Sequence, residues 1–306
     1  MQDLRIIYMG TPEFAVPSLQ ILVEHGYKVV AVVTAPDRPK GRGQKLTTTP
    51  VKDYAVAQHI PVLQPTNLKS PEFLEELKSY NANLQIIVAF RMLPVAVWDM
   101  PEIGTFNLHG SLLPQYRGAA PINWAIINGE KETGVTTFFL KHEIDTGNVI
   151  FQEKEPIEEA DTVGDVYQRL MERGAGLVLK TVKAIEANDY PQLSQDTAVE
   201  IKHAPKIFKE TCEIDWTKSS QEVYDFIRGL SPYPAAWTVL NEKNFKIFGT
   251  KKLDFSGTDK KPGEYVTDNK TYLHVQTGGN AIAITDLQME GKKRMDIGSF
   301  LRGTQL

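Results

Sequence analysis

The sequence has almost no cysteine and no long apolar run, and both absences restrict what the protein can be. Cys212 is the single cysteine among 306 residues, so the chain can form no internal disulfide and offers no cysteine cluster for a metal ion. No apolar run approaches the ~20 residues that a membrane-spanning helix needs. The opening MQDLRIIYMG lacks the basic region and cleavage site of an export signal. We therefore expect a cytoplasmic protein that does not bind membranes.

Two nucleotide-binding signatures are also missing. The first expected strand is followed by GTPEF at residues 10–14 instead of G-x-G-x-x-G, which disfavours a nicotinamide or flavin dinucleotide, and no G-x-x-x-x-G-K-[ST] loop occurs. A net charge of −4 argues weakly against a general nucleic-acid binder. Residues 206–306 carry 15 Lys+Arg against 13 Asp+Glu, whereas the first 205 carry 19 against 25. This asymmetry is too small to identify a partner alone.

Apolar patterning predicts an α/β domain at the front of the chain. Short runs rich in β-branched residues predict buried strands, and a strand–helix–strand order gives parallel pairs with right-handed crossovers. We expect strands over 4–9, 28–34, 62–64, 84–90, 105–108, 134–140 and 149–154, with helices over 16–24, 71–78, 121–128 and 162–185.

Composition changes near residue 190, and this change predicts a second domain. Residues 190–205 contain two prolines and no convincing period, so we place an interdomain linker there. One helix (220–230) and about five short strands follow in roughly 100 residues, which is typical of a small barrel of the oligonucleotide-binding (OB) type; a sandwich is the alternative. The predicted boundaries are 1–189, 190–205 and 206–306.

Five cations and no acid lie between residues 38 and 52: Arg38, Lys40, Arg42, Lys45 and Lys52. Gly41 and Gly43 predict a flexible loop. In an acidic domain such a loop is suited to gripping a phosphate backbone. A solvated surface loop is an equally good interpretation from these residues alone.

The stretch FNLHGSLLPQYRGAAPI at residues 106–122 is the strongest candidate site. Asn107 and His109 are two residues apart, so they leave the same face of an extended segment. An amide and an imidazole at a strand end suit a site where a carbonyl is attacked. A lone histidine more often satisfies a buried hydrogen bond, but Asp145, in the turn EIDTG, supplies the carboxylate that favours catalysis.

Several motifs, in order along the chain, resemble the methionyl-tRNA formyltransferase family. They are MGTPEFAVPSL, PDRPKGRGQKL, LHGSLLPQYRGAAPI, TGVTTFFLKHEIDTG and HAPKIFKETCEIDW. The resemblance implies a Rossmann-like, mostly parallel formyltransferase domain followed by a smaller OB-like β-barrel domain. It also implies transfer of the formyl group of 10-formyltetrahydrofolate to the α-amino group of methionyl-initiator-tRNA.

The same resemblance assigns roles to individual residues. Asn107, His109 and Asp145 match the catalytic positions. The folate-contacting positions are Ser111, Leu112, Leu113 and Pro114, with Phe90 beside the expected pterin pocket. The positions expected to contact methionyl-tRNA are Phe14, which would touch the methionyl side chain, together with Arg38, Lys40, Arg42, Lys45 and Lys206.

The expected chemistry needs two hydrogen-bond donors and a proton acceptor. Asn107 and protonated His109 would stabilise the tetrahedral oxyanion, while Asp145 would orient His109 and accept the amine's proton. We expect no metal, and a monomeric protein. The family commonly has Tyr-Gly at Phe90-Arg91 and Arg-Trp-Arg at residues 115–117, so this chain departs from it at both places.

Three other functions remain open from the sequence. A sugar-nucleotide N-formyltransferase or a 10-formyltetrahydrofolate hydrolase would use the same N-x-H and Asp arrangement. The basic loop and the basic tail favour a large polyanionic acceptor instead. A non-catalytic RNA-binding module is the third, but such a protein does not need Asn107, His109 and Asp145 together.

Overall fold

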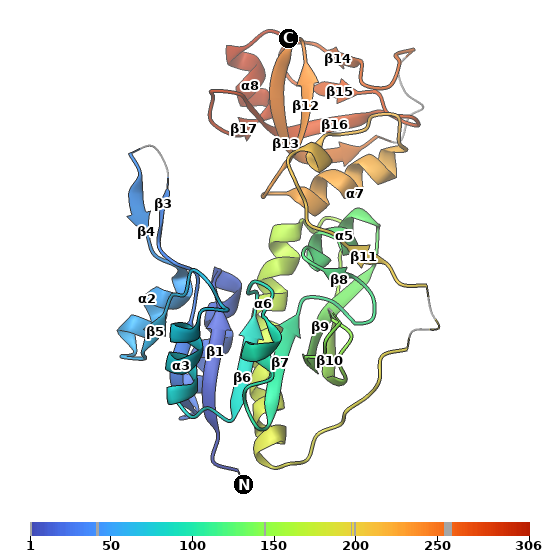
Figure 1. Cartoon of the computed structure of the whole chain (residues 1–306). Helices are drawn as coiled ribbons and strands as arrows, with labels where there is room; N and C mark the ends of the chain where they lie inside the picture. Colours follow the sequence, from blue (N-terminus) through green and yellow to red (C-terminus); the bar gives the residue numbers. More distant parts are fainter. Residues whose placement is uncertain (1, 41–42, 144, 197, 199, 254–258) are drawn as a thin grey trace. The chain divides into compact units, whose positions relative to one another are not determined.

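A computed structural model describes residues 2–40, 43–143, 145–196, 198, 200–253 and 259–306 (Figure 1). Its contacts divide the chain into two compact units. The first comprises Met1–Arg117, Gly134–Glu155 and Tyr167–Lys202, and the second comprises Gly118–Thr133, Pro156–Val166 and His203–Leu306. No helix in the described part of the chain has the length and apolarity of a membrane span.

The first unit is built on a seven-stranded sheet in the order β10-β9-β7-β6-β1-β2-β5. The five neighbouring strands β5, β2, β1, β6 and β7 all run parallel to one another. Strand β9 runs antiparallel to β7. The predicted Rossmann-like, mostly parallel sheet is therefore confirmed. The bounds are β1 Arg5–Gly10, β2 Lys28–Val33, β5 Val62–Leu63, β6 Leu84–Val88, β7 Gly104–His109, β9 Glu132–Phe139 and β10 Val149–Pro156.

Helices cover this sheet and begin at residues whose chemistry suits a helix start. The Thr49 hydroxyl accepts a hydrogen bond from the Lys52 amide at α2, and Ser70 does the same for Phe73 at α3. Each of these helices has proline in its first turn, where the missing N–H costs nothing. The helices are η1 Glu13–Ala15, α1 Val16–Glu24, α2 Pro50–Ala57, α3 Pro71–Ser79, α4 Val95–Trp98 and α6 Val163–Glu186.

The strand order indicates where a ligand would bind in this unit. From β1 the chain builds outward through β2 and β5 on one side, and β6 and β7 lie on the other. Open α/β sheets bind ligands beyond the carboxyl ends of their strands, where the order reverses. The segments after β1, β6 and β7 leave this edge at Thr11, Ala89 and Gly110, and all three carry residues singled out from the sequence.

The described residues on either side of Gly41 and Arg42 form a hairpin that the sequence did not predict. Residues 38–40 and 45–47 form an antiparallel hairpin, β3 Arg38–Lys40 with β4 Lys45–Thr47, in which Lys40 lies opposite Lys45. Gly43 and Gln44, in the connection between the two strands, have positive φ values of +106° and +53°. The prediction of a flexible loop missed this pairing, because three-residue strands leave too short a pattern to detect.

The second unit contains an antiparallel sheet in the order β12-β13-β16-β15-β14, with β17 paired to β16. Such a sheet agrees with the OB-like barrel domain expected here. Its strands are β12 Ala236–Leu240, β13 Lys243–Lys252, β14 Tyr265–Thr267, β15 Leu273–Val275, β16 Ile282–Met289 and β17 Met295–Asp296. Its helices are α5 Pro121–Ile127, η2 Glu210–Cys212, α7 Ser220–Leu230 and α8 Ile297–Gly303, and the short strands β8 Arg117–Gly118 and β11 His203–Ala204 complete the chain.

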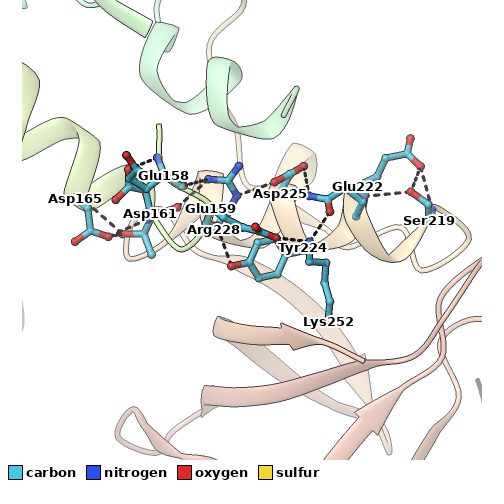
Figure 2. A network of polar contacts seen from close by, with 12 residues as sticks. Glu158, Glu159, Asp161, Asp165, Ser219, Glu222, Tyr224, Asp225, Arg228 and Lys252 are labelled. Carbon is cyan, nitrogen blue, oxygen red and sulfur yellow. Dashed lines mark hydrogen bonds and ion pairs between the residues drawn. The ribbon is translucent and has the colours of Figure 1, made fainter. Parts of the chain in front are cut away.

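A buried ion pair lies on α7 in the second unit (Figure 2). The Arg228 Nε atom lies 2.7 Å from Asp225 Oδ1, and both side chains are about 5% exposed. The Arg228 Nη1 atom also donates to the carbonyl oxygens of Glu158 and Asp161, at 3.3 and 3.0 Å. One guanidinium thus joins α7 to the segment that connects β10 with α6.

Replacing Arg228 by alanine should lower the free energy of unfolding of this unit by about 3–5 kcal/mol, because Asp225 would stay buried without its cationic partner. Lys252→Ala is the control: its ion pair with Glu159 is 2.6 Å long, but the Glu159 side chain is 69% exposed, so its loss should destabilise the unit far less. Urea denaturation followed by tryptophan fluorescence measures both. Equal destabilisation by the two variants would show that the buried pair has no special role.

Candidate active site

Asn107 and His109 lie on β7 and share one face of the strand, as expected from their spacing. The His109 ring is 6% exposed, and its Nε2 lies 2.9 Å from the Tyr116 carbonyl oxygen. Since a carbonyl oxygen only accepts, Nε2 carries the proton of this bond, which leaves Nδ1 as the other ring position. Asn107 is half-buried, and among the described residues its carboxamide has no hydrogen-bond partner.

The loop after His109 is held by two polar side chains from the neighbouring strands. Thr136, opposite His109 on β9, donates from Oγ1 to the Ser111 carbonyl at 2.6 Å and accepts from the Leu113 amide at 3.2 Å. Gln152 on β10 donates from Nε2 to the Leu113 carbonyl at 2.8 Å. Within the loop, Ser111 Oγ donates to the Gln115 carbonyl at 2.7 Å. The loop therefore has a fixed conformation beside the two candidate catalytic residues.

The residues predicted to contact folate, Ser111 to Pro114, differ in solvent exposure. Ser111 is fully buried, and Leu113 is 5% exposed and packs with Phe138 and Val149. Leu112 and Pro114 are half-buried. Leu113 thus anchors the loop to the core, and the more exposed pair is better placed to touch a ligand. The folate contacts of this loop stay a prediction.

Asp145 lies in the turn between β9 and β10, with a φ of +54°. Its carbonyl oxygen accepts a hydrogen bond of 2.7 Å from Gln195 Nε2. Gly147, two residues further on, permits a close approach, because a Cβ there would collide with the Phe139 carbonyl. Ile144 of the predicted EIDTG turn lies outside the described residues. The catalytic role of Asp145 stays a prediction.

Phe90 follows β6 at the carboxyl edge of the sheet and precedes residues 91–94, which line a cavity. The Arg91 guanidinium carbon lies 5.7 Å from the centre of the Phe90 ring, and the guanidinium donates to the Pro65 and Thr66 carbonyls. The cavity has a volume of about 480 Å³ and is lined by residues 66–69 and 91–94. This volume falls within the range of about 300–1,000 Å³ that is usual for ligand pockets.

Phe14, the predicted methionyl contact, is packed inside the first unit. It is 6% exposed, and its ring centre lies 5.1 Å from that of Tyr167. The Phe14 amide also donates to the Tyr167 hydroxyl at 3.1 Å. These contacts account for Phe14 as a core residue, and its contact with a methionyl group stays a prediction.

Asp37, just before the hairpin, and Lys52, just after it, belong to one polar cluster. Lys52 Nζ lies 2.6 Å from Asp37 Oδ2 and 2.9 Å from Gln64 Oε1. The hydrogen bond from Gln64, together with Lys52, lowers the pKa of the Asp37 carboxyl group below its usual value. Lys52 is therefore paired inside the fold and is not a free cation of the loop. Arg38 is exposed, and Arg42 lies outside the described residues.

Lys206, the remaining predicted tRNA contact, belongs to the second unit. Its Nζ lies 5.3 Å from the ring centre of Phe208, which is 55% exposed. A cation over an exposed aromatic ring is an ordinary surface arrangement worth roughly 0.5–1 kcal/mol. It leaves the side chain accessible to a phosphate, and that contact stays a prediction.

Three residues that hold the site were not found from the sequence: Thr136, Gln152 and Gln195. All are neutral polar residues, two inside strands and one in the presumed linker. They form no motif and carry no charge, and their bonds go mainly to backbone atoms. Only the folded chain shows which carbonyls they reach.

Comparisons with known proteins agree with this architecture. Residues 4–182 match the Formyl transferase family, and residues 206–305 match the Formyl transferase, C-terminal domain family. A methionyl-tRNA formyltransferase of Bacteroides fragilis is 55% identical over 313 residues, which cover 100% of this chain and 96% of that protein. One of Flavobacterium johnsoniae is 51% identical, covering 99% of this chain and 97% of that protein.

Solved structures share the fold at lower identity. WlaRD, a sugar 3N-formyl transferase crystallised in the presence of dTDP and 5-N-formyl-THF, is 22% identical and superposes with a TM-score of 0.69 over 96% of this chain and 100% of that chain. HypX from Aquifex aeolicus in complex with tetrahydrofolic acid is 20% identical, with a TM-score of 0.64 over 99% of this chain and 48% of that chain. By its full-length similarity to the curated relatives, the chain belongs to the methionyl-tRNA formyltransferase family.

Proposed function

We propose that this protein transfers the formyl group of 10-formyltetrahydrofolate to the α-amino group of methionyl-initiator-tRNA and releases tetrahydrofolate. The observation that carries the proposal is the pair Asn107 and His109 on one face at the end of β7, beside a loop held rigid by Thr136 and Gln152. The full-length relatives, which are named methionyl-tRNA formyltransferases, support the choice of acceptor.

The reaction exchanges one carbon–nitrogen bond for another. The amine nitrogen bonds to the formyl carbon and gives a tetrahedral species with a negative oxygen, and the bond from that carbon to the folate nitrogen then breaks. The Asn107 amide N–H and a protonated His109 stabilise the negative oxygen, because donors fixed in advance favour the transition state. Asp145 takes the amine's proton, and His109 supplies the proton with which the folate nitrogen leaves.

The two substrates bind to different parts of the chain, the folate to a mainly apolar loop and the tRNA to exposed cations. The folate lies along Phe90 and the loop from Ser111 to Pro114, at the carboxyl edge of the sheet. The hairpin cations and Lys206 contact tRNA phosphates, with Phe14 near the methionyl group. We further propose that the protein acts as a monomer in the cytoplasm, with tetrahydrofolate as product and no metal.

A sugar-nucleotide N-formyltransferase is the second candidate, because WlaRD shares the fold over nearly the whole chain. At 22% identity that likeness concerns the fold alone, whereas the methionyl-tRNA formyltransferases match at above 50% along their full length. The fold does not distinguish a sugar-nucleotide acceptor from a tRNA acceptor. The cations of the hairpin favour the tRNA, which is a polyanion.

The deciding experiment offers the enzyme both acceptors in turn with 10-formyltetrahydrofolate. We expect rapid formylation of methionyl-initiator-tRNA and none of a dTDP-linked amino sugar. N-acetylmethionyl-tRNA, which has no free amine, is the negative control. Formylation of the sugar alone would show that the proposed acceptor is wrong.

A further inference from the structure

The side chain of Gln195 joins two parts of the candidate site. Its Oε1 accepts two hydrogen bonds from the Arg117 guanidinium, from Nη2 at 2.6 Å and Nε at 3.2 Å. Its Nε2 donates to the carbonyl oxygens of Asp145 and Gly147, at 2.7 and 2.9 Å. The oxygen of this carboxamide therefore accepts from Arg117, and its nitrogen donates to the turn that contains Asp145.

The segment around Gln195 reinforces this connection from both ends. On one side of Gln195, the Leu193 amide and carbonyl pair with those of Val149, just after the Asp145 turn, at 2.9 and 2.8 Å. On the other side, the Lys202 carbonyl accepts from the Tyr116 amide at 2.6 Å. The Tyr116 carbonyl is the group that holds the His109 ring. The segment assigned to the linker thus contacts the backbone on both sides of the site.

We propose that Gln195 is a positioning residue for formyl transfer: it holds the Asp145 turn beside Arg117, so that Asp145 and His109 keep a fixed relative placement. The catalytic part of this inference rests on the proposed function, because it takes formyl transfer as the reaction. Its geometric part, that the Gln195 donors order residues 145–148, can be measured without any substrate.

Glutamine suits this role because its carboxamide combines a donor with an acceptor in one plane. Asp145 adopts a left-handed conformation, which aspartate tolerates better than most residues with a Cβ. The Gln195 donor bonded to the Asp145 carbonyl fixes that peptide. Glutamate at position 195 would still accept from Arg117, but its second oxygen would face two carbonyl oxygens at hydrogen-bond distance. Leucine would fill similar space with neither function.

The test compares Gln195→Glu and Gln195→Leu with Gln168→Leu, in which an exposed glutamine on α6 that bonds to Glu172 is changed. Steady-state kinetics gives kcat and both KM values, and hydrogen–deuterium exchange of the free protein reports on residues 145–148. We expect both Gln195 variants to lose about 10- to 100-fold in kcat, since a displacement near 1 Å has effects of this size. Both KM values should stay within about twofold, and exchange at residues 145–148 should rise. The Gln168 variant should behave like the wild type.

A purely structural role predicts a different outcome. If Gln195 only anchored the linker, Gln195→Glu, which keeps the Arg117 bonds, would retain its kcat within twofold, and that result would overturn the inference. Unchanged exchange at residues 145–148 in both variants would overturn it as well. A wild-type protein that fails to formylate methionyl-tRNA would instead refute the proposed function, while the exchange comparison would still decide the geometric part.

Discussion

Replacing His109 by alanine should reduce formyl transfer by at least about 100- to 1,000-fold, the usual cost of losing one donor to a developing oxyanion. The variant would lack both this donor and the proton that the leaving folate nitrogen needs. The effect should fall on kcat, because the ring stabilises a charge that exists only in the transition state. Single-turnover rates with saturating 10-formyltetrahydrofolate and methionyl-tRNA measure it.

The fold should survive this change. His109 contributes a hydrogen bond to the fold, to the Tyr116 carbonyl, worth roughly 1 kcal/mol. Circular dichroism and folate binding should therefore stay close to those of the wild type. His25→Ala, which removes an exposed ring bonded to the Ile21 carbonyl, is the control and should leave the rate unchanged. Near-normal turnover of the His109 variant would remove this residue from the mechanism.

Reversing the charges of Arg38 and Lys45 together should raise the KM for methionyl-tRNA by about 10- to 100-fold at low salt. The two residues lie on the two strands of the hairpin, in a stretch whose cations have no acid among them. Binding of a polyanion by such cations releases counterions, so its salt dependence reports how many phosphates are contacted. The slope of log KM against log salt concentration should fall by about two. The kcat at saturating tRNA should change little.

The matched control carries the same change of net charge elsewhere on the first unit. Lys28 and Lys78 are exposed, and Lys28→Glu with Lys78→Glu should leave the KM for tRNA within about twofold. Equal effects of the two double variants would mean that only the overall charge matters. An unchanged KM in the hairpin variant would show that the hairpin does not bind tRNA.

The main elements of the fold could be predicted because their sequence patterns are long. The strand over 28–33 is apolar after Lys28, and the strand over 84–88 is apolar apart from Gln85. The helices α1 and α7 have the bounds expected from their periodicity. The hairpin at 38–47 was missed because its strands have three residues each. Proline lies inside the first strand, and glycines separate the two strands in the sequence. In such short segments the pairing itself decides the structure, and a single strand gives no sign of it.

The candidate site could be predicted only in part. The N-x-H spacing places Asn107 and His109 on one face, because alternation along a strand is a local property. Residues that hold their surroundings reach groups far away in the sequence: Gln195 bonds to the Asp145 backbone carbonyl, 50 positions away, and to the Arg117 guanidinium, 78 positions away. Their bonds depend on how distant loops meet, which the folding of the whole unit decides. The packing of Phe14 against Tyr167 was likewise not apparent from the sequence, because Tyr167 lies on a distant helix.

The most direct test of this account follows the formyl carbon itself. The enzyme is mixed in excess with methionyl-initiator-tRNA and 10-formyltetrahydrofolate labelled in the formyl group, and the products of one turnover are separated. We expect the label on the methionine nitrogen of the tRNA, in an amount equal to the tetrahydrofolate formed. Label recovered as formate, or label that stays on the folate, would contradict direct transfer at the end of β7.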